Sequence, residues 1–311
     1  DTNTESMDAM GKSVLKLATD KKIPVGIDDM VTSLYDIRSA GITAGDAMGT
    51  LEDSSKLAVS GLSTVAEATD IMTSGMNAFK SEGLSSTQIA NIFFKTTQYG
   101  KTTVAQMSQA FGANASIINA AGVKLADYSA ATAALTTSGL PAAQAQNQLR
   151  AAVVSLTKPT ADMQKVFDSL GVSTGEQLIA KFGSLGGAFG AVKGTSEKLH
   201  LNLGKVTGSV EAMGAILGVT GANNSVYTAS LADMTKGTNA LDAAFEKQSA
   251  KTSNRMKVMK NQVQVLAISV GNVLLPALSS IVSGLSNAAA WMTNFSEKHP
   301  TLTKVIVIAT A

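Results

Sequence analysis

The chain has 311 residues, of which 45% are hydrophobic, 5% aromatic and 15% charged, and its net charge is +2. This length is enough for two domains, and so small a net charge gives no general reason to expect a strongly acidic partner such as nucleic acid. Cysteine is absent, which excludes disulfides and thiolate chemistry.

The first 25 residues predict one helix, from Ser6 to Asp20, and a linker around Pro24. The chain starts at Asp1 in a polar run without a signal-peptide pattern, and it stops within an apolar run that ends at Ala311. We therefore expect both ends to have been cut from a longer polypeptide.

A glycine recurs between residues 26 and 180, followed by an apolar residue and in most copies by Ser, Thr or Pro. Glycine closes a helix in the left-handed conformation at no steric cost, and the apolar residue after it packs back on the last turn. The pattern predicts short helices that end at Gly41, Gly61, Gly83, Gly122, Gly139 and Gly171.

Capping boxes begin several of the helices that follow these glycines. In a capping box, a Ser or Thr and the Glu or Gln three residues later each satisfy a free backbone N–H of the other. The sequence predicts four such pairs: Thr64 with Glu67, Ser85 with Gln88, Thr103 with Gln106, and Ser173 with Glu176.

Residues 181–238 are rich in glycine, with five between Gly183 and Gly194. Helices here are expected to be short, or packed closely enough to require glycine. The polar run 223–225 is expected to be a loop.

Residues 239–311 differ, because a long helix is expected to begin near Thr238. Apolar residues spaced alternately by three and four predict a seam, which makes either a coiled coil or a tightly packed hairpin. The predicted oligomer seam consists of Met256, Met259, Val263, Leu266, Val270 and Val273. Basic residues at Lys247, Lys251, Arg255, Lys257 and Lys260 are interpreted as the solvated face of this helix.

The uncharged stretch from Asn261 to Ser296 leaves two alternatives open. Its centre, Val263 to Trp291, exceeds the roughly 20 apolar residues that span a bilayer. Because it also contains Pro276 and several polar residues, a buried or intersubunit helical hairpin is favoured over insertion into a membrane.

Together these patterns predict an all-α fold. We expect an N-terminal helix and linker over residues 1–25 and an irregular, solenoid-like array of short helical hairpins over 26–180. Short glycine-rich helices over 181–238 and a long helix or coiled coil with an apolar hairpin over 239–311 complete the predicted domains.

Motifs that resemble catalytic signatures fail on their context. Gly171 to Gly175 matches G-x-S-x-G, but a helix precedes it where a nucleophile elbow needs a strand, so Ser173 is interpreted as a helix cap. The only histidines, His200 and His299, have no ligand-like spacing to other groups. The sequence therefore predicts no enzyme, and no catalytic, cofactor or metal site.

Several motifs, taken in order, resemble the core region of phage tail tape measure proteins. That family typically shows G-h-x-x-x-x-A-x-x-x-L-R, then L-x-x-P-T, L-G-h and later L-L-P-x-L with a downstream Trp. The matching segments here are 139–150, 156–160, 170–172 and 274–278 with Trp291. Residues 146–148 depart from the family, because they are Gln-Asn-Gln where many members carry small residues.

The resemblance implies a structural virion protein that sets tail length during assembly and is released at DNA ejection. It implies a homo-oligomer of three or six copies in the tail tube lumen or at the tail tip, with tail tube and tail-tip or baseplate proteins as partners. It implies no sequence-specific binding of nucleic acid, and contact with a host membrane would use Val263 to Trp291.

Two other classes stay open. A helical scaffold or adaptor outside phages would show exposed aromatic and arginine anchors on a concave face, and aromatic residues are scarce here. A membrane-permeabilising helical effector would share the apolar C-terminal stretch, and virion context would distinguish it.

The geometry of an α-helix adds an expectation about which part of the protein measures tail length. A single helix of 311 residues would span roughly 470 Å at about 1.5 Å per residue. The glycine turns forbid such a helix, so residues 26–240 are expected to be a compact module at one end of the rod and not its measuring part.

Overall fold

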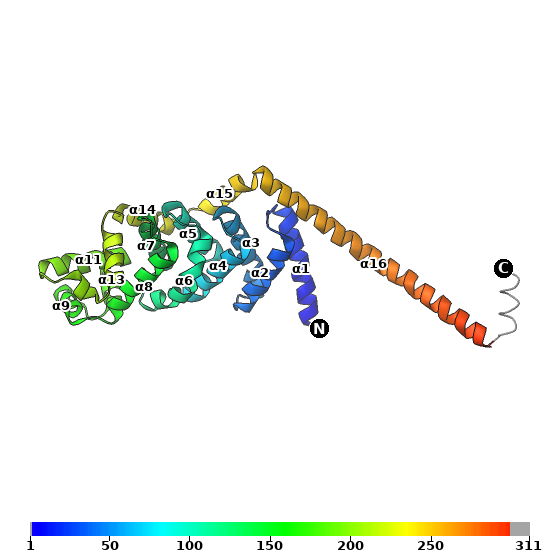
Figure 1. Ribbon diagram of the computed structural model, residues 1–311, viewed down its shortest axis with the longest axis horizontal. Helices are drawn as coiled ribbons and strands as arrows, with labels where there is room; N and C mark the ends of the chain where they lie inside the picture. The colour runs from blue at the N-terminus through cyan, green and yellow to red at the C-terminus, as the bar shows by residue number, and fades with distance from the viewer. Residues whose placement is uncertain (1, 299–311) are drawn as a thin grey trace. The chain divides into compact units, whose positions relative to one another are not determined.

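The computed structural model describes the backbone of residues 2–298 and, outside 270–285 and a few further positions near the two ends, their side chains. Within residues 2–298 the fold is all-α, without a strand, and Figure 1 shows its course. The helices are α1 (Thr2–Asp20), α2 (Ile27–Ser39), α3 (Ala44–Ser60), α4 (Val65–Ala78), the 3-10 turn η1 (Lys80–Glu82), α5 (Ser86–Tyr99), α6 (Val104–Ala120), α7 (Leu125–Thr137), α8 (Ala142–Thr157), α9 (Ala161–Leu170), α10 (Gly175–Phe182), α11 (Leu185–Lys198), α12 (Leu203–Thr207), α13 (Val210–Thr220), α14 (Asn224–Thr235), α15 (Ala240–Ser249) and α16 (Thr252–Lys298).

Contacts divide the chain into two units, Asp1–Val258 and Met259–Ala311, so the boundary falls within α16. We call the helices α1 to α15 the module. The four segments expected from the sequence stay a prediction.

Alternate helices of the module pack side by side in two rows. One row is α2, α4, α6 and α8, and the other is α3, α5 and α7, as Figure 1 shows. The chain then turns back, because α13 packs on α8 and α14 packs on α7. Hairpins joined by tight turns produce the rows, whereas the return of α13 and α14 departs from a simple tandem array.

An aromatic cluster fills the centre of the module. Phe111 of α6 lies with its ring centroid 5.0 Å from that of Phe93, edge to face, and 5.7 Å from that of Tyr128. Phe79 is 6.3 Å from Phe111, and all four side chains are at most 2% exposed. Rings at these separations add stabilisation beyond the apolar area that they bury, so these four side chains strengthen the packing of α4 to α7.

The backbone is left-handed at five of the six glycines named from the sequence. The five φ angles lie between 63° and 92°, at Gly41, Gly83, Gly122, Gly139 and Gly171. The apolar residue after the glycine is buried at Ile42, Val123 and Val172, and the N–H of each bonds to a carbonyl five residues earlier. These are Schellman endings, which let the chain reverse within a few residues.

Gly61 is the exception, and there the expected left-handed glycine is wrong. Its φ is −97°, and Leu62 takes the positive φ of 57° instead. The position still requires glycine, because a Cβ would lie 2.3 Å from Cγ2 of Val104 and 2.8 Å from the carbonyl oxygen of Leu57. Close approach between the end of α3 and the start of α6 therefore selects the residue.

Three of the four expected capping boxes are present, at Thr64, Ser85 and Thr103. The fourth is wrong by one residue, because Thr174 is the N-cap of α10 and accepts from the N–H of Gln177. Ser173 is exposed, and its N–H donates to the side chain of Gln177.

A buried carboxylate joins three helices that are distant in sequence. Asp127 of α7 accepts a hydrogen bond from the hydroxyl of Tyr227 in α14 and one from the N–H of Leu185 at the start of α11, both 2.6 Å long. Burial raises the pKa of Asp127 to about 6, although these two hydrogen bonds act to lower it. The N–H of Gly186 donates to the Tyr227 oxygen, where a Cβ on residue 186 would lie 2.2 Å from the ring.

Three expectations for the later part of the chain are corrected. Asn224 and Ser225 are helical, because α14 begins at Asn224. The long helix begins at Thr252, since α15 ends at Ser249, and not near Thr238. The expected apolar hairpin is wrong, because α16 is one continuous helix through Pro276 to Lys298.

Candidate functional site: the seam of α16 and the seat of α15

The apolar seam of α16 is exposed where its side chains are described. Met256 is 58% exposed, Met259 52%, Val263 61% and Leu266 64%. The spacing of three and four residues places them on one face of the helix, and buried Val258 and Asn261 fall on the opposite face. The side chains of Val270 and Val273 lie outside the described ones. Exposed apolar residues in such a row are typical of a surface that binds another protein.

Cationic side chains cluster at the start of this helix. The five basic residues between Lys247 and Lys260 are all exposed, and none forms an ion pair among the residues that the structure describes. No Asp or Glu occurs between Glu246 and Glu297. The start of α16 therefore carries a positive charge that its own segment does not neutralise.

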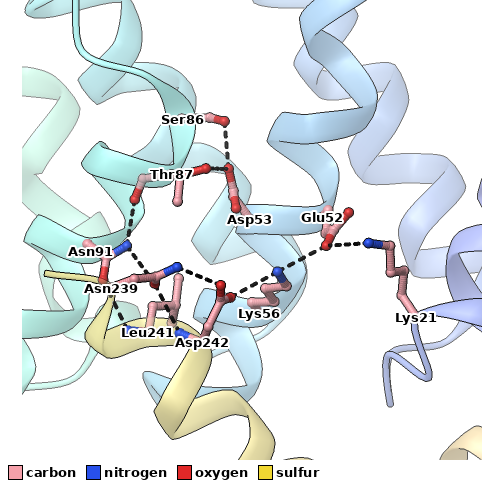
Figure 2. Close-up of polar contacts among 10 residues, drawn as sticks. All are labelled: Lys21, Glu52, Asp53, Lys56, Ser86, Thr87, Asn91, Asn239, Leu241 and Asp242. Atoms are coloured by element: carbon pink, nitrogen blue, oxygen red, sulfur yellow. Dashed lines mark hydrogen bonds and ion pairs between the residues drawn. The ribbon is translucent and has the colours of Figure 1, made fainter. Parts of the chain in front are cut away.

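Polar side chains of α3 and α5 hold α15, the helix before α16, as Figure 2 shows. We call this group the seat of α15; it consists of Asn91 of α5 and of Glu52, Asp53 and Lys56 of α3. Asn91 of α5 donates to Oδ1 of Asn239 at 3.1 Å and accepts from the N–H of Leu241 at 3.0 Å. Asn239 caps α15 by accepting from the N–H of Asp242. One amide of α5 thus serves two positions at the beginning of α15.

Charged side chains of α3 complete this seat. Lys56 lies 2.9 Å from both Asp242 of α15 and Glu52 of its own helix, and Lys21 is 3.6 Å from Glu52. Burial acts to raise the pKa of Asp242, but the Lys56 ammonium more than compensates and lowers it. Asp53 accepts hydrogen bonds from the hydroxyls of Ser86 and Thr87 at the start of α5. Burial raises the pKa of Asp53, although these two hydrogen bonds act to lower it.

Lys95 is the most deeply buried charged group near the seat, at 1% exposure. Its ammonium donates to the carbonyl oxygen of Asp233 and to the hydroxyl of Thr238, both at 2.7 Å, and lies 3.4 Å from the Asp233 carboxylate. The hydroxyl of Tyr99 donates to the same carboxylate at 3.3 Å. Lys95 therefore fixes the connection between α14 and α15 to α5.

A pocket of about 390 Å³ lies beside this connection. Its polar lining includes Glu82, Asn91, Lys95, Lys124 and Thr238. Among the described residues no group of three or more His, Asp or Glu side chains could hold a metal ion. The polar groups of the pocket that are described above bind other parts of the chain, so they are structural.

Of the two histidines, the structure describes His200, which belongs to neither the seam nor the seat. His200 has a positive φ of 55° in the turn between α11 and α12, and it is exposed. His299 lies outside the described residues.

Sequence reasoning missed the seat and the Asp127 link. Lys95 and Asp127 are each the single charged residue of their helices, α5 and α7. The available signal was a single charged residue in an otherwise uncharged helix. If such a helix is buried, its charged residue is buried with it and needs a partner elsewhere in the chain. The partners of these two side chains lie 58 or more residues away in sequence, at positions that no local pattern marks.

Comparison with known proteins defines the class of this all-α chain. Residues 8–202, more than half of its length, match the family model described as phage-related minor tail protein. The chain therefore belongs to the phage-related minor tail protein family, whose members are structural proteins of phage tails.

Within that class, the chain is similar to the protein named tape measure protein of Pneumococcus phage Dp-1. The two are 25% identical over 287 residues, which are 88% of this chain and 24% of that relative. The resemblance to tape measure proteins is thus confirmed, and the chain spans about a quarter of the length of this relative. No solved structure matches it significantly.

Insertion into a membrane is the alternative that the sequence leaves open for the apolar stretch of α16. In the part of the chain that the structure describes, no helix combines the length and the apolar character needed to cross a bilayer.

Proposed function

We propose that this chain is the core region of a tape measure protein, in which the module forms one end of a rod and copies associate along the seam of α16. The observation that carries the proposal is the exposed row Met256, Met259, Val263 and Leu266 in a member of a phage tail family. Knobs-into-holes packing of such a row between copies would bury it.

The finer role follows from the resemblance. The protein would contribute to tail length during assembly, leave at DNA ejection, and contact tail tube and tail-tip or baseplate proteins in the tube lumen or at the tip. Homo-oligomers of three or six copies would be held together by the seam. The relative is named for the tape measure role, which supports this assignment.

Changing Val263 and Leu266 together to Asp tests the seam. The double variant should be monomeric, because each carboxylate would have to be buried without a partner. Sedimentation equilibrium against the unchanged chain gives the measurement. Val210→Asp is the matched control, because Val210 is 74% exposed on α13 of the module and should leave the mass of the oligomer unchanged. An unchanged mass for the double variant would discard the seam.

An in-frame deletion of residues 60–140 tests the role of the module. It removes the aromatic cluster, so phage carrying it should be defective or without tails. Viable particles with tails shortened in proportion, seen by electron microscopy, would make the module the ruler and would contradict the proposal.

A further inference from the structure

The two charged residues that flank the start of the seam lie at the positions that decide helix pairing. With Met256 and Val263 at heptad position a and Met259 and Leu266 at d, Arg255 takes position g and Lys260 takes position e. Side chains at g of one helix lie beside those at e of the next heptad on a parallel partner, five residues further along. Arg255 of one copy would therefore face Lys260 of another.

This contact between two cations is repulsive, and the segment around it does not neutralise their charge. Both side chains are exposed, and a second copy brings no carboxylate between residues 247 and 296. In the proposed function the copies share one tail axis and run along it in the same direction, so their seams would pair in parallel. A parallel seam thus carries a ring of unneutralised cations at its beginning.

We infer that Arg255 and Lys260 of neighbouring copies form a cationic ring that binds phosphate groups and makes assembly of the seam depend on them. A phosphate carries about −1.5 to −2 charges near neutral pH, so one group balances the two cations of a contact, whereas one carboxylate balances only one. The guanidinium of Arg255 also presents paired donors that match phosphate oxygens. This inference rests on the proposed seam and adds its orientation and its ligand.

Charge reversal at position e provides the test on the full chain. Lys260→Glu turns each repulsive contact into an attractive one, so the dissociation constant should fall about tenfold and lose its dependence on phosphate. Lys257→Glu is the matched control, because it changes the net charge equally but lies at position b, away from the partner. The unchanged chain should associate more tightly in pyrophosphate than in chloride of equal ionic strength.

The outcomes separate this inference from the seam itself. Equal effects of Lys260→Glu and Lys257→Glu, or no difference between pyrophosphate and chloride, would overturn the ring while the seam test with Val263 and Leu266 could still succeed. A monomer in every condition, Lys260→Glu included, would overturn both. A short DNA duplex that strengthens association at far lower concentration than pyrophosphate would support the ring and assign its phosphates to nucleic acid.

Discussion

The module and α16 differ in how far their large apolar side chains are exposed. In the module most large apolar side chains are buried, and Phe111 and Tyr128 are at most 2% exposed, whereas exposed ones such as Tyr35 and Val210 occur singly. In α16 the described seam residues are more than half exposed. The module buries most of its apolar side chains, whereas α16 displays a regular row of them. This difference is the one expected if copies associate through α16, as proposed, and not through the module.

Truncating one large apolar side chain in each region should give the largest contrast. Phe111→Ala removes the ring at the centre of the aromatic cluster and should lower the free energy of unfolding by about 3–5 kcal/mol. Leu266→Ala, at a side chain that is 64% exposed, should leave unfolding of the module unchanged and weaken only association. Urea unfolding by circular dichroism and sedimentation measure the two effects, and equal losses of stability would break the comparison.

Protonation of Asp127 should give the next largest effect, confined to the module. Its pKa is raised by burial to about 6 from 3.8, so its contribution to stability is full below pH 4 and is lost as pH rises through 6. Relative to Asp127→Asn, the unchanged chain should therefore lose roughly 3 kcal/mol between pH 4 and pH 7. Lys124 acts to lower this pKa and Glu82 acts to raise it.

Urea unfolding of both proteins over this pH range provides the measurement. The difference between them isolates Asp127 from the other carboxyl groups, which titrate in both. A difference that is constant over this pH range would show that folding leaves the pKa of Asp127 unchanged, and would contradict the prediction.

Replacing Lys95 sharpens the comparison at the edge of the module. Lys95→Met keeps the volume but leaves the carbonyl oxygen of Asp233 and the hydroxyl of Thr238 without their donor, at a cost of about 2 kcal/mol. Amide exchange in α15 should accelerate more than in α7, because the seat holds α15. Lys101→Met, at an exposed residue, should change neither rate. Uniform acceleration across the module would mean that the seat is not a separate unit.

What the sequence predicted was set by interactions over short distances along the chain. The capping boxes at Thr64, Ser85 and Thr103 join residues three apart, and the glycine turns join residues five apart. Ser173 and Thr174 are each followed by a suitable partner three residues later, so local chemistry does not separate them and the prediction of Ser173 is wrong by one residue. The row on α16 followed from its spacing, and its exposure became visible only in the structure.

What the sequence did not predict depends on distant partners. The break between α15 and α16 carries no Gly or Pro, and α15 is placed by Leu241 and Phe245, which are buried, together with Asn91, 150 residues before Leu241. Asn147, one of the residues that depart from the resembling family, also acts over distance. Gln146 is 1% exposed and Asn147 accepts from Asn114 of α6, so this departure is built into the packing of α6 on α8.

Because α13 and α14 pack on α8 and α7, the module can complete its packing only late in translation. Asp127 and its partner Tyr227 are separated by 100 residues, so a ribosome adding about 5–20 residues per second needs roughly 5–20 s to deliver the second after the first. During that interval the nascent chain presents the faces of α7 and α8 that the later helices will cover. Translation products that stop before α13 should therefore be retained by chaperones or degraded, and a host that slows elongation would lengthen this vulnerable period.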